Sequence, residues 1–373
     1  MSWGVIGTGA LAGIGRTAEE VFDALCAGRS GIGALRGFDQ ALFKADRLYE
    51  VDNRGDGDRP RRATELLLDA VAMAVAEAGI GDDLAEVPVL VGTGLRELRS
   101  VELWATGEAA LDASALHFGG ALRERFGARD AHTFANACSA SLYALALGAD
   151  LLDAGAADTV VVAGVDVITE TMFGVSDRVQ MTPPEAIRPF DRARAGTILG
   201  EGAVAVVLSR DPRAPAVGRL RSVGVTCDAF HSTAPDAAGI RAAVHEAHRR
   251  AGVKPDDIDL VVMHGTGTQL NDHVEAGVTA EVFAPGRRPL LTGIKSMTGH
   301  TSGAAGLLNL VVALRAMAAG RVPPITGLRD PIGEVDGFTV VRGEAMPCTA
   351  SLAQVNAFGF GGVNAVGIVE VAR

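Results

Sequence analysis

The stretches AVAEAGIGDDLAEVPVLVGTG at residues 74–94 and AHRRAGVKPDDIDLVVMHGTG at residues 247–267 share one pattern. Each begins in an amphipathic helix, turns at alanine-glycine, passes through an acidic loop and continues as an apolar strand ending in GTG. A glycine just past each helix is typical of a helix C-cap. Because a duplicated unit constrains the whole fold, this offset near 173 residues predicts two related halves.

A second pair of segments strengthens the duplication. NACSASLYALALGADLLDAG at residues 136–155 parallels TGHTSGAAGLLNLVVALRAMAAG at residues 298–320, each a small-residue turn entering a helix that stops at glycine. Continuous apolar runs such as TVVVAGVDVI at residues 159–168 suit strands covered on both faces. The pattern predicts an α/β layered protein with two sheets, divided into residues 1–210 and 211–373. Two ordinary doubly wound domains are the alternative.

Composition excludes several classes of function. The chain has 373 residues, a net charge of −11 and 5% aromatic residues, which argues against nucleic-acid binding because phosphate neutralisation needs a basic face. No uninterrupted apolar run approaches the roughly 20 residues that cross a bilayer, and the start lacks the basic flank of a signal peptide. We therefore expect a cytoplasmic protein with no membrane contact.

The spacing of the cysteines and glycines does not indicate a metal site or a dinucleotide-binding site. Four scattered cysteines lack the paired spacing of a zinc site or a disulfide framework, so we expect no bound metal. The opening GTGALAG lacks the GxGxxG spacing of a nicotinamide-binding loop. The charged segment DNRGDGDRPRR at residues 52–62 is predicted to be an exposed loop.

Cys138 is the strongest candidate nucleophile. It lies where an extended approach meets a small-residue turn and then a helix, in TFANACSASLYALALGADLL. A helix N-terminus favours thiolate and so predicts a lowered thiol pKa, and its free N–H groups can serve an oxyanion. Inert packing is the alternative for any buried cysteine, and it is our expectation for Cys26, Cys227 and Cys348.

Three further motifs accompany this cysteine. HGTGTQLNDHVEAG at residues 264–277 places a histidine after the apolar strand LVVM, then a glycine turn and a helix with two acids. KSMTGHTSGAAG at residues 295–306 has a histidine five residues after a lysine, and NAFGFGGVNAVGIVE at residues 356–370 is a glycine-rich aromatic loop entering a strand. Together the four motifs resemble those of β-ketoacyl synthases of the elongating, Cys-His-His type. RPFDRARAGTILGEGA (188–203) and CDAFHSTAPD (227–236) match as well, so the resemblance covers nearly the whole chain.

The resemblance implies a fold and a reaction. The fold is thiolase-like, with five αβαβα layers built from the two halves. The reaction is a decarboxylative Claisen condensation: an acyl chain passes to Cys138, and a malonyl-type extender then attacks the acyl thioester as an enolate. Both substrates arrive on the phosphopantetheine of an acyl carrier protein, or on coenzyme A, in fatty-acid or polyketide biosynthesis. No cofactor is bound.

The resemblance also assigns roles to individual residues. His264 and His300 donate hydrogen bonds to the developing enolate, Lys295 keeps these histidines deprotonated, and Glu275 holds the network in place. The backbone N–H groups of Cys138 and Phe360 form an oxyanion hole, and Phe358 and Phe360 form a gate. Thr266 and Thr268 contact the pantetheine arm. The two threonines could instead cap the next helix.

Partners follow from the same resemblance. We expect an acyl carrier protein and a dimer, either of two copies or with a homologous subunit. An acidic enzyme needs a local basic patch to attract an acidic carrier, and the candidates are Arg59, Arg61, Arg62 and Arg194. The other six histidines have no ligand cluster and are expected to be solvated or structural: His117, His132, His231, His245, His248 and His273.

Some features depart from the family pattern. Asn136, Ala140 and Val366 replace residues more usual in relatives, with little consequence for mechanism. Residues 39–62 and 94–134 are shorter than in typical relatives, so pocket shape and acyl preference are open, and Leu95, Leu98, Leu103 and Trp104 are either pocket wall or ordinary core helix. Two alternative functions remain: an acyltransferase or thioesterase that does not decarboxylate, and a partner subunit of a ketosynthase heterodimer.

Overall fold

Eleven strands form one sheet in the computed structural model, which describes residues 2–55, 58–284 and 286–372. The strand order is β5-β4-β6-β7-β1 in the first half and β8-β15-β14-β9-β10-β12 in the second. Strands β1, β4, β5, β6 and β7 therefore occupy the same places as β8, β9, β10, β14 and β15. The predicted duplication is confirmed, but the prediction of two separate sheets is wrong, because β1 and β8 pair edge to edge at Trp3 and Leu220.

The elements of the first half alternate between strands and helices from the start of the chain. They are β1 (Trp3–Ala12), α1 (Ala18–Cys26), β2 (Ile32–Ala34), β3 (Arg47–Tyr49), α2 (Arg62–Ala78), β4 (Val89–Gly92), α3 (Leu98–Ala105), α4 (Phe118–Phe126), β5 (Ala131–Phe134), α5 (Ala140–Asp153), β6 (Thr159–Asp166), α6 (Glu170–Val179) and β7 (Gly202–Ser209). Short 3-10 turns lie at Gln40–Leu42, Ala113–Leu116 and Ala137–Ser139.

The second half repeats this alternation and adds short strands near its end. Its elements are β8 (Gly218–Cys227), α7 (Ala237–Ala251), β9 (Leu260–Val262), α8 (Gln269–Phe283), β10 (Leu290–Thr292), α9 (Lys295–Thr298), α10 (Ala305–Ala319), β11 (Arg321–Val322), β12 (Thr339–Val340), β13 (Met346–Pro347), β14 (Leu352–Gly359) and β15 (Val363–Val371). The predicted division at residue 210 falls between β7 and β8 and stays a prediction.

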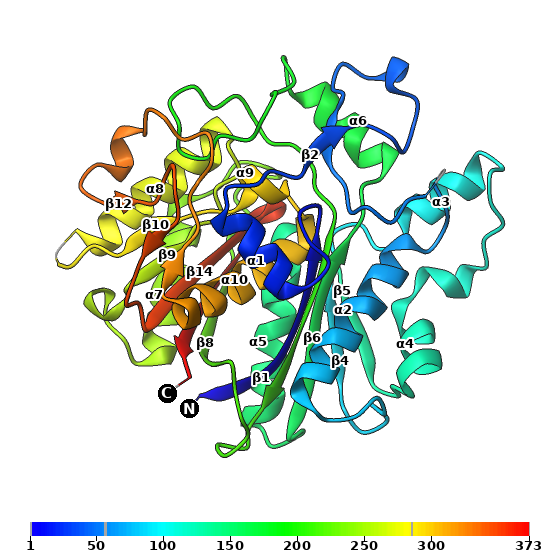
Figure 1. The fold of residues 1–373 in the computed structure, drawn as a ribbon, viewed down its shortest axis with the longest axis horizontal. Helices are drawn as coiled ribbons and strands as arrows, with labels where there is room; N and C mark the ends of the chain where they lie inside the picture. Colours follow the sequence, from blue (N-terminus) through cyan, green and yellow to red (C-terminus); the bar gives the residue numbers. More distant parts are fainter. Residues whose placement is uncertain (1, 56–57, 285, 373) are drawn as a thin grey trace.

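The layers follow from what each helix covers. Helices α5 and α10 pack against each other in the centre, between the two halves of the sheet (Figure 1). Helices α2 and α4 cover the outer face of the first half, and α7 and α8 cover that of the second. The result is the five-layered αβαβα arrangement of the thiolase-like fold.

Strand β6 shows why apolar runs suit these positions. Side chains alternate across a strand, so Val160 and Val162 enter the central cluster while Val161, Ala163 and Val165 enter the outer one. Each face meets helices, and so the strand is apolar throughout. The predicted C-caps are also confirmed, since Gly79 after α2 and Gly252 after α7 have left-handed φ values of 65° and 66°.

The central helix α10 is unusually apolar. The segment Ser302–Ala319 is long and apolar enough to span a membrane by length and composition, but 78% of it is buried inside the protein. It packs on α5 and on strands of both halves, which is the environment of a core helix. The cytoplasmic location expected from the sequence stays a prediction.

Candidate active site

Cys138 sits in the 3-10 turn Ala137–Ser139 at the start of α5, on the central layer. Ala137 adopts a left-handed φ of 51°, a strained backbone that turns the chain sharply before the cysteine. Ser302, at the equivalent turn of the second half, has a φ of 46°. A Cβ at the next residue, Gly303, would lie 2.6 Å from the Thr93 backbone, so only the first turn has room for a nucleophile's side chain.

Two histidines from the second half meet this cysteine. His300 Nε2 lies 3.1 Å from Cys138 Sγ. The rings of His264 and His300 are 5.4 Å apart at nearly right angles, and Phe358 packs against His264. The backbone N–H groups of Phe360 and Cys138 donate toward the sulfur. Five of the residues that the sequence analysis placed at the reaction centre are therefore brought together: Cys138, His264, His300, Phe358 and Phe360.

The backbone around His264 is fixed by acids from α8. The carboxylate of Glu275 accepts the N–H groups of His264 at 2.6 Å and Gly265 at 2.8 Å. Asp272, one turn earlier, accepts from Thr266 at 3.0 Å. These bonds set the turn that follows β9, and so they set the direction of the imidazole.

Lys295 fixes the tautomer of His264. Its ammonium lies 3.3 Å from Nδ1 of His264 and donates to the carbonyl oxygen of the same residue. An ammonium has only donors, so Nδ1 must carry the lone pair and Nε2 the proton. His300 differs, because its Nδ1 has no partner among the described residues.

Burial sets the charge state of the site. It lowers the pKa of both His264 and His300 well below the ordinary value, and nearby Lys295 lowers both further. Burial also lowers the pKa of Lys295 to about 8 and raises that of Glu275. Neutral histidines beside a cation are the arrangement that the sequence analysis predicted.

The thiol behaves differently from the prediction. Burial raises the pKa of Cys138 to about 11, and the Lys295 charge and the two N–H donors only partly offset it. The predicted lowering by the helix start is wrong for the resting protein, because loss of solvent outweighs the dipole. The sulfur therefore carries its proton until a base removes it.

A cavity of about 640 Å³ leads to these residues. Its lining includes Cys138, the two histidines, Phe358 and Phe360, and also residues of α6 and of the segment after it. Phe358 is buried but Phe360 is 53% exposed, as the mouth of a cavity requires. Thr266 and Thr268 also line it, and Thr268 caps α8 by accepting from Asn271, so the capping alternative is confirmed for Thr268 while contact with the pantetheine arm stays a prediction.

Sequence reasoning missed Asp166 at the end of β6. Its buried carboxylate accepts from Thr93, Gly94 and Leu95 in the first half and from Gly303 in the second, all at 2.6–2.8 Å. It joins the two turns that flank the site, and burial raises its pKa to about 6. A carboxylate closing the apolar run TVVVAGVD was the available signal.

Several predicted positions are wrong. Arg62 is buried with its guanidinium on Glu201 at 2.7 Å, and Arg194 is buried against the carbonyls of Thr268 and Gln269, so neither can belong to a docking surface. Of the candidates, only Arg59 and Arg61 reach solvent. Leu95, Leu98, Leu103 and Trp104 are absent from the described cavity lining, and of the four only Leu103 is buried, while Trp104 is 56% exposed. Their part in an acyl pocket stays a prediction.

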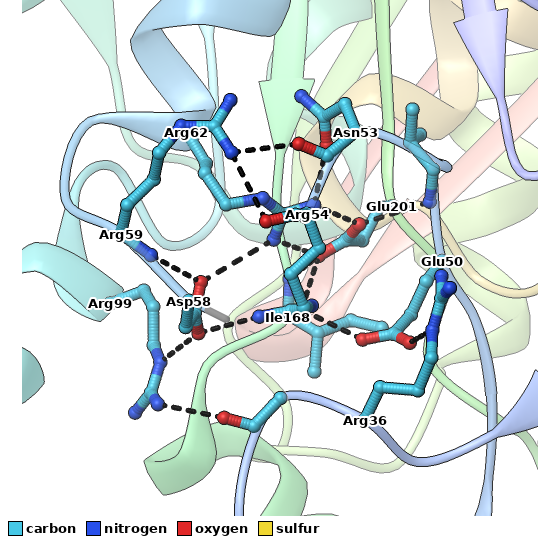
Figure 2. Close-up of polar contacts among 12 residues, drawn as sticks. Arg36, Glu50, Asn53, Arg54, Asp58, Arg59, Arg62, Arg99, Ile168 and Glu201 are labelled. Atoms are coloured by element: carbon cyan, nitrogen blue, oxygen red, sulfur yellow. Dashed lines mark hydrogen bonds and ion pairs between the residues drawn. The ribbon is translucent and has the colours of Figure 1, made fainter. Parts of the chain in front are cut away.

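The segment 52–62 is correspondingly not exposed throughout its described part, residues 52–55 and 58–62, and residues 56–57 lie outside the described residues. Figure 2 shows Arg54, Asp58 and Arg62 from this segment converging with Glu201. The side chains of Arg54 and Arg62 are at most 2% exposed, and they are neutralised by the nearby acids Glu50 and Asp58 and by the distant Glu201. We call the set Glu50, Arg54, Asp58, Arg62, Arg99 and Glu201 the buried ion network.

Comparison with known proteins agrees with this geometry. Residues 4–214 match the family model for the β-ketoacyl synthase N-terminal domain, and residues 217–329 match that for the C-terminal domain. The chain is 28% identical to 3-oxoacyl-[acyl-carrier-protein] synthase I of Hordeum vulgare over 411 residues, covering 97% of this chain and 87% of the relative. It is 28% identical over 398 residues to 3-oxoacyl-[acyl-carrier-protein] synthase 2 of Synechocystis, covering 96% and 95%.

A solved structure extends the match to three dimensions. The ishigamide ketosynthase/chain length factor superimposes with a TM-score of 0.89 and 27% identity, covering 100% of this chain and 99% of that one. The alignment with the Hordeum relative is longer than this whole chain, so the relative has segments that are missing here. The chain belongs to the β-ketoacyl synthase family, enzymes that form carbon-carbon bonds by acyl transfer.

Proposed function

We propose that this protein condenses an acyl group held on Cys138 with a malonyl-type extender, both delivered on a carrier-bound phosphopantetheine. The observation that carries the proposal is the 3.1 Å contact between His300 and Cys138 beside a second neutral histidine, His264. Fatty-acid and polyketide biosynthesis use the same chemistry. The curated relatives' names specify substrates on an acyl carrier protein.

The first half-reaction is acyl transfer. As the sulfur of Cys138 attacks the thioester carbonyl, its proton passes to His300 Nε2, since the thiol with a pKa of about 11 does not ionise unaided. The N–H groups of Cys138 and Phe360 hold the oxyanion. Collapse forms the Cys138 thioester, breaks the bond to the carrier sulfur, and returns the proton to the departing thiolate.

The second half-reaction needs hydrogen-bond donors. Loss of CO₂ leaves its electron pair in the extender as an enolate, and the enolate oxygen accepts from Nε2–H of His264. The enolate carbon then attacks the acyl carbonyl and expels Cys138 as a thiolate, which takes up one proton from water in the cavity, so that each turnover consumes one proton. His300 can donate here as well, because no described partner fixes its tautomer between the two steps.

Assembly and docking belong to the same proposal. Strand β5 is an edge of the sheet, and an unpaired edge supports strand pairing with a second subunit, identical or homologous. The name of the ishigamide protein pairs a ketosynthase with a chain length factor. Arg59 and Arg61 remain the candidates for attracting an acidic carrier.

The test is a product assay with acyl- and malonyl-carrier thioesters. The expected outcome is one β-ketoacyl product per CO₂ released, both measured by mass spectrometry. Acyl hydrolysis without CO₂ would instead identify the acyltransferase or thioesterase alternative. In His264→Ala, self-acylation should survive in part while decarboxylation falls about 10²–10³-fold, the cost of losing one oxyanion donor. Equal, mild losses in both steps would assign His264 a structural role.

A further inference from the structure

A chain of buried polar side chains links the outer helix layer to the reaction centre. His248 on α7 is 4% exposed, and its Nε2 lies 2.8 Å from the side-chain oxygen of Gln354 on β14. The Gln354 amide nitrogen donates to Asn356 at 2.9 Å, and the Asn356 amide nitrogen donates to Glu275 at 3.0 Å. Gln354 and Asn356 are two apart on β14, so they share one face of the strand.

The direction of every hydrogen bond in this chain is determined. An ionised Glu275 only accepts, so Asn356 turns its NH₂ group toward the carboxylate and its oxygen toward Gln354. Gln354 must then present its own oxygen to His248, which requires a proton on Nε2. This leaves Nδ1 as a lone pair, and Nδ1 has no partner among the described residues. The donors of all three side chains point toward Glu275, and aligned bonds strengthen one another.

Glu275 is the residue that most needs such support. It is buried, and burial raises its pKa; its hydrogen bonds from Gly265, Asn356 and His264 oppose that shift. Its countercharge is Lys295, and Asp272 on the same helix is a second buried acid. If Glu275 became neutral, the ammonium of Lys295 would lose its compensating charge, and the tautomer of His264 would no longer be fixed.

We propose that His248 and Gln354 are positioning residues that keep Glu275 ionised and thereby hold Lys295 and His264 ready for decarboxylation. This inference rests on the proposed function for its catalytic readout. It assigns a role to a histidine that sequence reasoning treated as solvated or structural. It also places the control of the second half-reaction outside the cavity, since neither residue belongs to the described lining.

Gln354→Met tests the proposal, because it keeps the side-chain length and removes both polar groups. Decarboxylation of a malonyl thioester should fall about tenfold, while self-acylation of Cys138 stays within about twofold. The pH profile of decarboxylation should narrow from its acid side: the acid limb moves to higher pH as Glu275 becomes harder to ionise, while the alkaline limb stays, because Glu275 is ionised there in both proteins. Parallel losses in both half-reactions, or an unchanged profile, would overturn it.

Matched variants separate the proposal from general damage. His248→Leu should reproduce the narrowed pH profile. His248→Gln keeps a hydrogen-bond donor and should retain the wild-type pH profile. Ser222→Ala is the control: it removes another buried hydrogen bond to α7, from Ser222 Oγ to the Ala247 carbonyl at 2.7 Å, without touching this chain. The other ionisable groups that act on His248 are His245 and Asp257, and they are present in every variant.

A stability readout keeps the test valid even if no condensation is observed. A carboxyl whose folded pKa is raised binds more protons folded than unfolded, so its contribution to stability falls as pH rises through that window. The unfolding free energy of Gln354→Met, relative to wild type, should therefore fall as pH rises above the ordinary glutamate pKa of 4.5. In a Glu275→Gln background that extra pH dependence should vanish. If the extra pH dependence persists in the Glu275→Gln background, Glu275 is not the group that His248 and Gln354 keep ionised.

Discussion

The buried ion network and the catalytic network are both buried, and by the catalytic network we mean His264, Glu275, Lys295 and His300. Burial nevertheless has opposite net outcomes for the pKa values of the two networks. In the ion network, burial opposes the charge on Arg62, but contact with Glu201 outweighs it and raises the pKa (Figure 2). Asp58 behaves alike: burial is outweighed by Arg99 and Arg54, and its pKa falls. In the catalytic network burial prevails, so Lys295 and the histidines shift toward neutrality.

The difference lies in pairing. Arg62 meets Glu201 through two bonds of 2.7 and 2.8 Å, whereas Lys295 contacts a histidine and a carbonyl oxygen and has its acid, Glu275, bonded elsewhere. Direct contact with an opposite charge keeps charges fixed, which suits structure; a charge whose counterion is bonded elsewhere leaves groups able to exchange protons, which suits catalysis. The two networks are also neighbours, because Gly200, next to Glu201, donates its N–H to the carbonyl of His300.

The largest effect should come from breaking the ion network. Arg62→Met leaves Glu201 buried without its bidentate partner, and we expect a loss of about 3–5 kcal/mol in unfolding free energy by urea denaturation. Arg59→Met is the matched control, since Arg59 and Glu65 are both about two-fifths exposed. That exposed pair should contribute about 1 kcal/mol or less. Equal losses in both variants would mean that the buried Arg62–Glu201 pair contributes no more to stability than an exposed pair.

Lys295→Met should have the opposite balance of effects to Arg62→Met. We expect little loss of unfolding free energy at pH 7 and a large loss of decarboxylation rate. The folded pKa of about 8 lies below the ordinary 10.5, so the unfolded chain binds more protons between these values. Wild-type stability relative to the variant should therefore rise with pH from about 8 to 10.5, by about 1 kcal/mol per unit. Urea denaturation at a series of pH values measures this. If the difference in unfolding free energy between wild type and variant did not depend on pH, the pKa of Lys295 would not be lowered in the folded protein.

A smaller effect concerns the reactivity of Cys138. With its pKa at about 11 instead of the ordinary 9.0, the resting thiol should react with iodoacetamide at pH 7 about 100-fold more slowly than the same cysteine in urea-unfolded protein. Peptide mapping resolves it from the three other cysteines. The rate should still climb between pH 8 and 10. A fast, pH-independent reaction from pH 7 would indicate a preformed thiolate.

The sequence predicted the features that are local or repeated. The strand-turn-helix around Cys138 and the histidine motifs each lie within a few consecutive residues, and the duplication is visible because its two copies repeat one pattern. The fold brings these motifs together because both halves have the same topology. Lys295 and His264 are read from separate motifs, and the structure joins them at 3.3 Å.

Pairings between distant residues could not be predicted in this way. The charges of RPRR suggested an exposed loop, but Arg62 is neutralised by Glu201, 139 residues away. The prediction of a lowered pKa for Cys138 was wrong for a related reason. A helix start can be recognised in the sequence, but the burial that outweighs its effect on the thiol pKa cannot. The chain from His248 to Glu275 joins two helices and a strand, and no single segment carries its pattern.

The most direct test of the central claim is acyl capture by Cys138, measured by intact mass after incubation with acyl-carrier thioesters. Wild type should gain the mass of one acyl group per chain, and peptide mapping should place it on Cys138. Cys138→Ala should gain none, because within the described residues no other cysteine faces the cavity or a histidine. Equal acylation of the variant would contradict the account of this site.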